Sequence, residues 1–165
     1  MKKIIVATGN EGKMDEIRQI LQGENIQFVS LKDENLQDVE IIENGSTFEE
    51  NAIIKARTIS DLTGQMVLAD DSGLEVDYLH GEPGIYSARY LGEDTSYDIK
   101  NQAILDRLKG VPKEQRTARF VCAIAAVLSD GKTLVTRETI EGYIGECPAG
   151  ENGFGYDPIF YVDEY

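Results

Sequence analysis

Residues 66–74 read M-V-L-A-D-D-S-G-L, and the expected fold is built around this stretch. The apolar run 66–69, bounded by turn residues, is typical of a strand in a sheet that is covered on both faces. We expect this strand to end there, so that Asp70 and Asp71 lie where open α/β sheets bind ligands. Two adjacent carboxylates also make each other's ionisation costlier unless a cation or hydrogen-bond donors offset it. Because Asp-Asp-Ser-Gly is equally good turn chemistry, a metal site and a plain turn both remain open for the pair alone.

The remaining elements predict one α/β domain over residues 1–165, with a mixed sheet. Short β-branched or apolar runs predict strands, and apolar residues at helical spacing predict helices. The dipeptide Asp130-Gly131 between two long strand-like runs is a strong hairpin signal. The sequence predicts strands at residues 4–7, 27–31, 66–69, 74–76, 118–129 and 132–143, a further candidate strand at 39–42, a loop at 80–89, and helices at 14–21, 48–62 and 97–108.

Composition excludes several classes of protein. The chain has a formal net charge of -14, so a broad basic face for a nucleic-acid duplex is not expected. The two cysteines, Cys122 and Cys147, have no metal-binding spacing and do not require an oxidising compartment. The longest apolar run, residues 120–128, is too short to cross a bilayer, and the N-terminus lacks a signal-peptide core. We therefore expect a soluble cytoplasmic protein with no nucleic-acid or membrane partner.

A glycine-containing segment, T-G-N-E-G-K at residues 8–13, joins the first predicted strand to a helix. This arrangement directs backbone N–H groups and a helix N-terminus toward an anion. The spacing matches neither the P-loop nor the dinucleotide-binding fingerprint, so a plain strand-to-helix turn also fits. Lys13 favours the anion site, because a cation in the first helical turn opposes the helix dipole unless a phosphate is bound.

The predicted helix 48–62 has clear start and stop signals. Ser46 and Thr47 are N-cap candidates with Glu49 and Glu50 three residues later, which gives two overlapping capping boxes, and Gly64 ends the helix. Lys55 lies off the centre of the apolar stripe, where a solvated lysine is the commoner case. Further on, the Gly-rich residues 145–157 carry Phe154 and Tyr156, aromatic side chains that can stack on a base or anchor the loop to the core.

Together these features match the parts of a metal-assisted site for a nucleoside phosphate: a phosphate-ready loop, a second lysine, an acidic pair, a further carboxylate at Glu43, and an aromatic-glycine loop. The chain also resembles the inosine triphosphate pyrophosphatase family, the XTP/dITP diphosphatases that remove non-standard purine nucleotides. The resemblance runs from residue 8 to residue 158 and is carried, in the family's order, by the segments T-G-N-E-G-K (8–13), T-F-E-E-N-A with K-A (47–52, 55–56), D-D-S-G-L (70–74), P-G-I-Y-S-A-R (83–89) and G-F-G-Y-D-P (153–158).

The resemblance implies hydrolysis of a purine nucleoside triphosphate to the monophosphate and pyrophosphate, with Mg²⁺ required. It also implies an elongated α/β fold with a central mixed sheet flanked by helices, two lobes with an active-site cleft, and a homodimer. Asp71 would be the general base and a metal ligand, with Glu43 as the other metal-binding carboxylate. The residues that would hold the triphosphate are Thr8, Gly9, Asn10, Glu11, Gly12, Lys13, Lys55 and Ser72, and those on the purine side are Phe154, Gly155, Tyr156 and Asp157.

Some questions stay open at this level. Asp70 could orient water, bind a second metal, or only hold a turn. The family continues with a C-terminal segment carrying a Ser-His-Arg motif that contacts the purine, whereas this sequence stops at Tyr165, so part of the family domain is expected to be missing. Two alternative functions are a phosphotransfer enzyme with an aspartate nucleophile, whose D-x-D spacing is absent, and a nucleotide-sensing module that binds magnesium.

Overall fold

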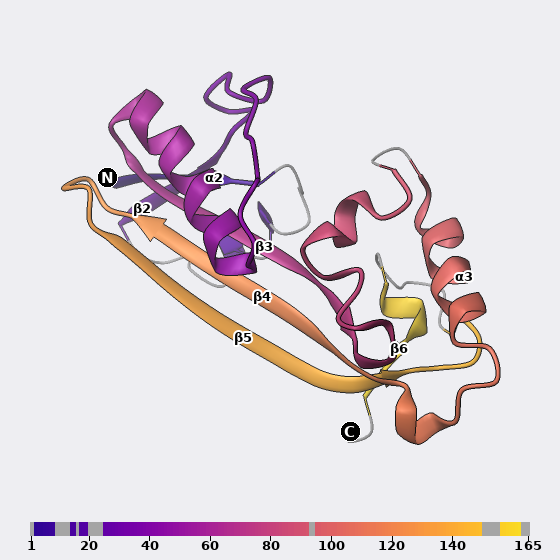
Figure 1. Ribbon diagram of the computed structural model, residues 1–165. Helices are drawn as coiled ribbons and strands as arrows, with labels where there is room; N and C mark the ends of the chain where they lie inside the picture. Colours follow the sequence, from indigo (N-terminus) through magenta and orange to yellow (C-terminus); the bar gives the residue numbers. More distant parts are fainter. Residues whose placement is uncertain are drawn as a thin grey trace. The chain divides into compact units, whose positions relative to one another are not determined.

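The computed structural model describes residues 2–8, 14–15, 17–19, 25–92, 95–149 and 156–162. Its strands form one mixed six-stranded sheet in the order β2-β1-β3-β4-β5-β6, which confirms the predicted α/β class (Figure 1). The strands are β1 (Lys2–Ala7), β2 (Ile26–Ser30), β3 (Met66–Val76), β4 (Thr117–Val127), β5 (Thr133–Ile144) and β6 (Phe160–Tyr161). The helices are α2 (Phe48–Thr63) and α3 (Tyr97–Arg107), with 3₁₀ turns at Asp77–Leu79, Gly84–Arg89, Lys113–Gln115 and Asp157–Ile159.

The chain divides into two compact units, and β3, β4 and β5 contribute residues to both. The first unit comprises Met1–Asp71 and Ala123–Arg137, and the second comprises Ser72–Cys122 and Glu138–Tyr165. No helix among the described residues has both the length and the apolar character that a membrane span requires.

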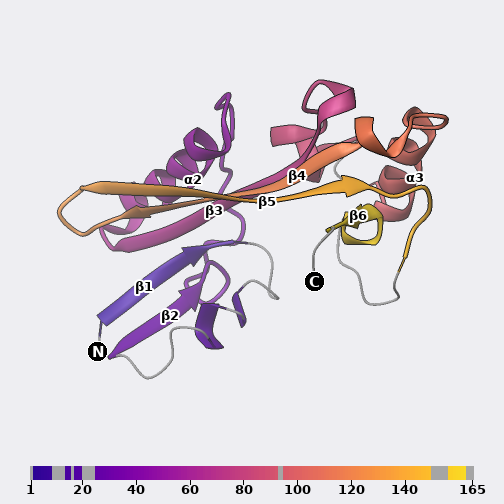
Figure 2. The same ribbon diagram turned by 90° about the horizontal axis from the view of Figure 1, so that it is seen from below.

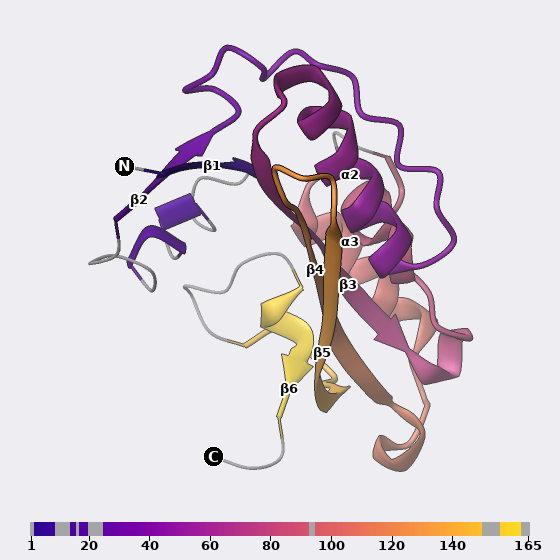
Figure 3. The same ribbon diagram turned by 90° about the vertical axis from the view of Figure 1, so that its left-hand side faces the viewer.

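In the first unit, β1 lies between β2 and β3 and is parallel to both, as Figure 2 shows for β1 and β2. Ile4, Val6 and Phe28 form a buried cluster with Met14 on one face of this part of the sheet. Helix α2 lies along the opposite face (Figure 3), where Ala52, Ala56 and Ile59 are fully buried. The small alanine side chains allow close approach of the helix to the strands.

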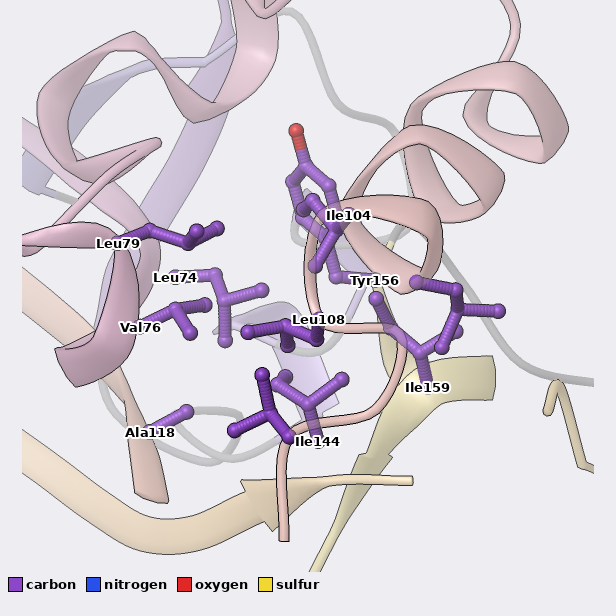
Figure 4. Close-up of a cluster of buried hydrophobic side chains, with 11 residues drawn as sticks. Leu74, Val76, Leu79, Ile104, Leu108, Ala118, Ile144, Tyr156 and Ile159 are labelled. Atoms are coloured by element: carbon purple, nitrogen blue, oxygen red, sulfur yellow. The ribbon is translucent and has the colours of Figure 1, made fainter. Parts of the chain in front are cut away.

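The second unit has its own apolar core, drawn in Figure 4. Side chains from β3, α3, β4, the end of β5 and the 157–159 turn meet there, and the central members are Leu74, Val76, Ile104, Leu108, Ile144 and Ile159. Arg116, which is also buried, donates hydrogen bonds to backbone carbonyls, among them Ile144 O at 2.8 Å and Gly145 O at 2.6 Å. Its charge is therefore dispersed over peptide dipoles at the edge of the core.

Several local predictions are confirmed. Helices α2 and α3 and the hairpin of β4 and β5 form where predicted, and the hairpin turn closes with Leu128 N–H donating to Lys132 O at 2.8 Å. Residues 14–15 and 17–19 are helical, as predicted, and the rest of that predicted helix lies outside the described residues.

Two local predictions are wrong, and a third gains detail. Strand β3 does not end at residue 69 but continues without a turn to Val76, so the two short predicted strands are one. Residues 39–42 form no strand. Val39 N–H donates to Leu36 O in a turn, and Ile42 is 64% exposed, so its side chain does not pack against the sheet. The predicted loop 80–89 contains a 3₁₀ turn at Gly84–Arg89.

Candidate functional site

The entry into α2 fixes the segment that carries Glu43. Thr47 is the N-cap, and its Oγ1 accepts a hydrogen bond from Glu50 N–H at 3.0 Å. The Glu50 carboxylate reaches back and accepts from Ser46 N–H at 2.6 Å and Ser46 Oγ at 3.0 Å. These bonds hold the pKa of Glu50 below its usual value. The preceding backbone is therefore tied to the first turn of the helix.

Asp70 and Asp71 lie beyond the carboxyl end of β1, although β3 itself continues. The parallel register of β1 with β3 stops at Ala7 opposite Ala69, so the next β3 residues have no β1 neighbour. The predicted location, beyond the carboxyl end of a parallel strand, thus holds for β1 rather than for β3. Successive side chains of a strand point to opposite faces, so the two carboxylates are not side by side. Asp71 follows Val67 and Ala69 on the face covered by α2.

Lys55 connects the helix to this part of β3. Its Nζ donates to the Asp70 carbonyl oxygen at 2.8 Å and lies 2.9 Å from Glu43 Oε1. The contact with Glu43 is an ion pair between largely buried side chains, which are 19% and 29% exposed. The structure therefore places Lys55 in a polar site of α2 rather than in solvent, and brings Glu43, Lys55 and Asp71 together.

Asn51 is a further member of this site, which the sequence analysis did not single out for a role. It is 1% exposed, its Oδ1 accepts from Gly45 N–H at 2.8 Å, and its amide favours the ionised form of Asp71, which lowers the pKa of that carboxyl. It precedes Lys55 by four residues, so both project from one face of α2. The signal in the sequence was an asparagine, a poor helix former, on the apolar stripe of the helix, because a buried amide requires partners.

The electrostatics of Asp71 are unusual for an aspartate. Burial raises its pKa from 3.8 to about 6. The positive charge of Lys55 opposes this rise and the negative charge of Glu43 adds to it, while the adjacent Asp70 makes the smallest contribution to the pKa. Within the described part of the chain, its buried Oδ2 atom has no hydrogen-bond partner. A half-buried carboxylate of this kind is a candidate proton acceptor or metal ligand.

The donor set suits a hard cation, because Mg²⁺ prefers oxygen ligands and is commonly held by one or two carboxylates together with substrate phosphates. Glu43 and Asp71 supply two carboxylates, each with a buried oxygen that accepts no hydrogen bond from a described residue, although Glu43 Oε1 is ion-paired with Lys55. No group of three or more metal-binding side chains occurs among the residues that the structure describes. The residues present therefore fit a two-carboxylate site completed by substrate and water, not a closed protein cage.

The other predicted site residues fall into two groups. Thr8 directly follows β1, at the same end of the sheet as Asp70, and Ser72 is the half-buried residue of β3 after Asp71. Those outside the described residues are Gly9, Asn10, Glu11, Gly12, Lys13, Phe154 and Gly155, and of Asp157 only the backbone is described, in a 3₁₀ turn.

Tyr156 belongs to the core of the second unit. Its side chain lies in the buried cluster drawn in Figure 4 and is 3% exposed. Its ring packs edge-to-face on Tyr97 at a centroid distance of 5.2 Å, and its hydroxyl donates to Ser87 O at 2.6 Å. Burial raises the pKa of this phenol well above its usual value. The aromatic residues of this loop were expected either to stack on a base or to anchor the loop to the core, and the Tyr156 side chain anchors it.

Comparison with known proteins gives a consistent result. A model of the Ham1 family matches residues 4–165. Proteins named dITP/XTP pyrophosphatase are 52% identical in Bacillus licheniformis (99% of this chain, 83% of the relative) and 48% identical in Bacillus subtilis (99% and 82%). The solved structure of the Staphylococcus aureus Ham1 protein is similar with a TM-score of 0.89 at 43% identity, covering 98% of this chain and 82% of that one. A HAM1 protein from Coxiella burnetii gives 0.89 at 40% identity, with the same coverage.

Proposed function

Because the chain belongs to the Ham1 family, we propose that it hydrolyses non-standard purine nucleoside triphosphates, dITP, XTP and ITP, to the monophosphate and pyrophosphate. Relatives that bear the name dITP/XTP pyrophosphatase, at 45–52% identity over nearly the whole chain, support this substrate class. The structural observation that supports it most is the half-buried Asp71 carboxylate, whose free oxygen lies in a site shared with Glu43 and Lys55.

Asp71 is the general base in this proposal. It takes a proton from water while the water oxygen bonds to phosphorus and the bond to the departing pyrophosphate breaks. A carboxylate is suited to this role when its pKa lies closer to the working pH, and burial has moved Asp71 in that direction. Glu43 and Asp71 would hold Mg²⁺, which when bound offsets phosphate charge and makes water more acidic.

Lys55 and the segment 8–13 supply positive charge and N–H donors to the triphosphate. The Lys55 ammonium, held by Glu43 and the Asp70 carbonyl, is already desolvated, so it offers a fixed charge to a phosphate oxygen at little cost in reorganisation. Lys13, Ser72 and the backbone of the loop would bind the remaining phosphates. On the purine side, Phe154 would stack on the base with Gly155 and Asp157 beside it, and the buried Tyr156 would anchor this loop to the core.

We also propose one functional domain over residues 1–165, with two lobes and an active-site cleft, assembled as a homodimer in the cytoplasm. These features accompany the proposed activity and have their own measurements. Sedimentation of the purified chain would give the oligomeric state, and a monomer at working concentration would refute the dimer.

Turnover assays test the proposed function. Purified protein is incubated with ITP, dITP, XTP, ATP or GTP, with and without Mg²⁺, and both pyrophosphate and orthophosphate are measured. We expect pyrophosphate release from the first three nucleotides, dependent on Mg²⁺, and no covalent aspartyl phosphate. Comparable rates on ATP would refute the selectivity, and release of orthophosphate alone would refute the bond that is cleaved.

A further inference from the structure

We propose that the ion pair between Lys55 and Glu43 is a closed form of the site, which Mg²⁺ and the substrate phosphates open together by an exchange of partners. Glu43 gives up Lys55 for the cation, and Lys55 gives up Glu43 for a phosphate oxygen. The inference rests on the proposed function, because it takes Glu43 as a ligand of Mg²⁺ and Lys55 as a phosphate-binding residue. It adds that each side chain blocks the other until both ligands arrive.

The contact between the two side chains is close, but it is not a hydrogen bond. Lys55 Nζ lies 2.9 Å from Glu43 Oε1, yet this buried oxygen atom accepts no hydrogen bond from a described residue. The hydrogen bond of the Lys55 ammonium runs instead to the Asp70 carbonyl oxygen, at 2.8 Å. Charge attraction therefore holds Glu43 to Lys55, and the carboxylate oxygen keeps a lone pair for a cation.

Burial explains why the pair forms when no ligand is bound. The Lys55 and Glu43 side chains are 19% and 29% exposed, so each charge has lost much of its water. A largely buried charge is costly unless an opposite charge or hydrogen bonds compensate it. The two side chains compensate each other, and Lys55 thereby occupies the Glu43 oxygen atom that a metal ion would need.

Either ligand by itself would leave one of these charges without a partner. Mg²⁺ alone would attract Glu43 and leave the Lys55 ammonium beside a second cation. A phosphate alone would attract Lys55 and leave the Glu43 carboxylate beside a second anion. Mg²⁺ and a phosphate together pair all four charges, so each should raise the affinity of the site for the other by the same factor.

The exchange needs little movement of Lys55. Its ammonium group has three donors on a flexible stem, and the bond to the Asp70 carbonyl uses one of them. This carbonyl belongs to β3, whose backbone is held by the sheet. Nζ can keep this bond while another of its N–H groups turns from Glu43 to a phosphate oxygen.

Two binding titrations without turnover test the exchange. In the first, Mg²⁺ alone is added to the full chain, and the NMR shifts of the backbone amides of residues 43 and 55 are followed. Lys55→Gln should raise the affinity for Mg²⁺ about 3- to 10-fold, because the competing charge is gone, and Lys55→Met serves if the glutamine variant does not fold. Arg57→Gln removes an exposed positive charge from the same helix and should change the affinity less than about 2-fold.

In the second titration, inorganic pyrophosphate is added in EDTA, so that no metal is bound. Glu43→Gln should raise the affinity for pyrophosphate about 3- to 10-fold, because Lys55 is released. The gain should disappear in the double variant Glu43→Gln/Lys55→Gln, which separates the release of Lys55 from the general loss of a negative charge. Glu40→Gln, at an exposed position of the same segment, is the matched control and should resemble wild type.

Distinct outcomes separate this inference from the proposed function. An unchanged or lower Mg²⁺ affinity in Lys55→Gln overturns the exchange, as does a pyrophosphate affinity that Glu43→Gln does not raise or that stays raised in the double variant. If both affinities change as expected but the wild-type protein releases no pyrophosphate from ITP, the proposed function fails while the exchange stands. Turnover of ITP together with unchanged affinities in the variants has the opposite meaning.

Discussion

Replacing Asp71 with asparagine should lower turnover at least ~100-fold and at the same time stabilise the metal-free fold. The carboxylate is held in a half-buried site beside Glu43, where its charged form is disfavoured despite Lys55 and Asn51. A pKa rise from 3.8 to about 6 corresponds to about 3 kcal/mol against the ionised form. Because the site is partly open to solvent, screening reduces this cost to roughly 1–2 kcal/mol. Asparagine has nearly the same shape and avoids the cost.

The sign of the pH dependence follows from the same shift. The folded-state pKa lies above the unfolded value, so between about pH 4 and pH 6 unfolded Asp71 has lost its proton while folded Asp71 still holds it. The stability of the wild-type protein therefore falls across this window relative to the variant, and the deficit is constant at higher pH. In EDTA at pH 8, Asp71→Asn should raise Tm by about 3–6 °C, and the gain should shrink toward zero near pH 4.

Thermal unfolding in EDTA at several pH values, together with pyrophosphate release from ITP, measures both effects. Turnover should drop at least ~100-fold, the usual scale for the loss of a general base. Asp61→Asn, at an exposed position of α2, is the control and should change neither quantity appreciably. A variant that is less stable than wild type at pH 8 would show that burial of the Asp71 charge does not destabilise the fold. A variant that retains normal turnover would show that the Asp71 carboxylate is not the general base.

Three further substitutions test single contacts. Lys55→Gln removes the ion pair with Glu43 and should lower kcat/KM for ITP by about 10- to 100-fold, the scale of one charge-assisted hydrogen bond. Steady-state kinetics measure kcat/KM, and an unchanged value would exclude Lys55 from substrate binding. Thr47→Ala removes the N-cap of α2 and should lower the free energy of unfolding by about 1 kcal/mol in urea titrations, whereas an unaltered midpoint would mean that the Glu50–Ser46 contacts suffice. Tyr156→Phe leaves the Ser87 carbonyl without its donor and should cost about 1–2 kcal/mol in the same assay; no loss would mean that water replaces the hydroxyl.

Elements with local signals could be predicted from the sequence. The start of α2 is encoded by Thr47 and its end by Gly64, which adopts the left-handed conformation with φ of 68°. The hairpin turn is likewise encoded by Asp130-Gly131, with Gly131 at φ of 89°. Such features depend on residues within a few positions of each other, so the surrounding fold changes them little.

The course of β3 could not be predicted in the same way. Asp70-Asp71-Ser72-Gly73 has good turn chemistry, yet these residues remain extended within one continuous strand of the sheet. Such sheet pairing is long-range and outweighs local propensity. The acidic pair does lie beyond the carboxyl end of a parallel strand, but that strand is β1 and not β3. The position of Asn51 within the helix could be read from the sequence, whereas Gly45 became its hydrogen-bond partner only through the fold.

The spacing of Asn51 and Lys55 along α2 has a consequence for changes in chain length. One turn of helix, about 6 Å of rise, separates the Asn51 side chain, which contacts Gly45, from the Lys55 side chain, which contacts the Asp70 carbonyl. Inserting one residue between them would rotate the second about 100° away from β3. Surface loops generally accept insertions, so we expect the segment before Glu43 to accept them better than the first two turns of α2, where a gained or lost residue would separate these two contacts.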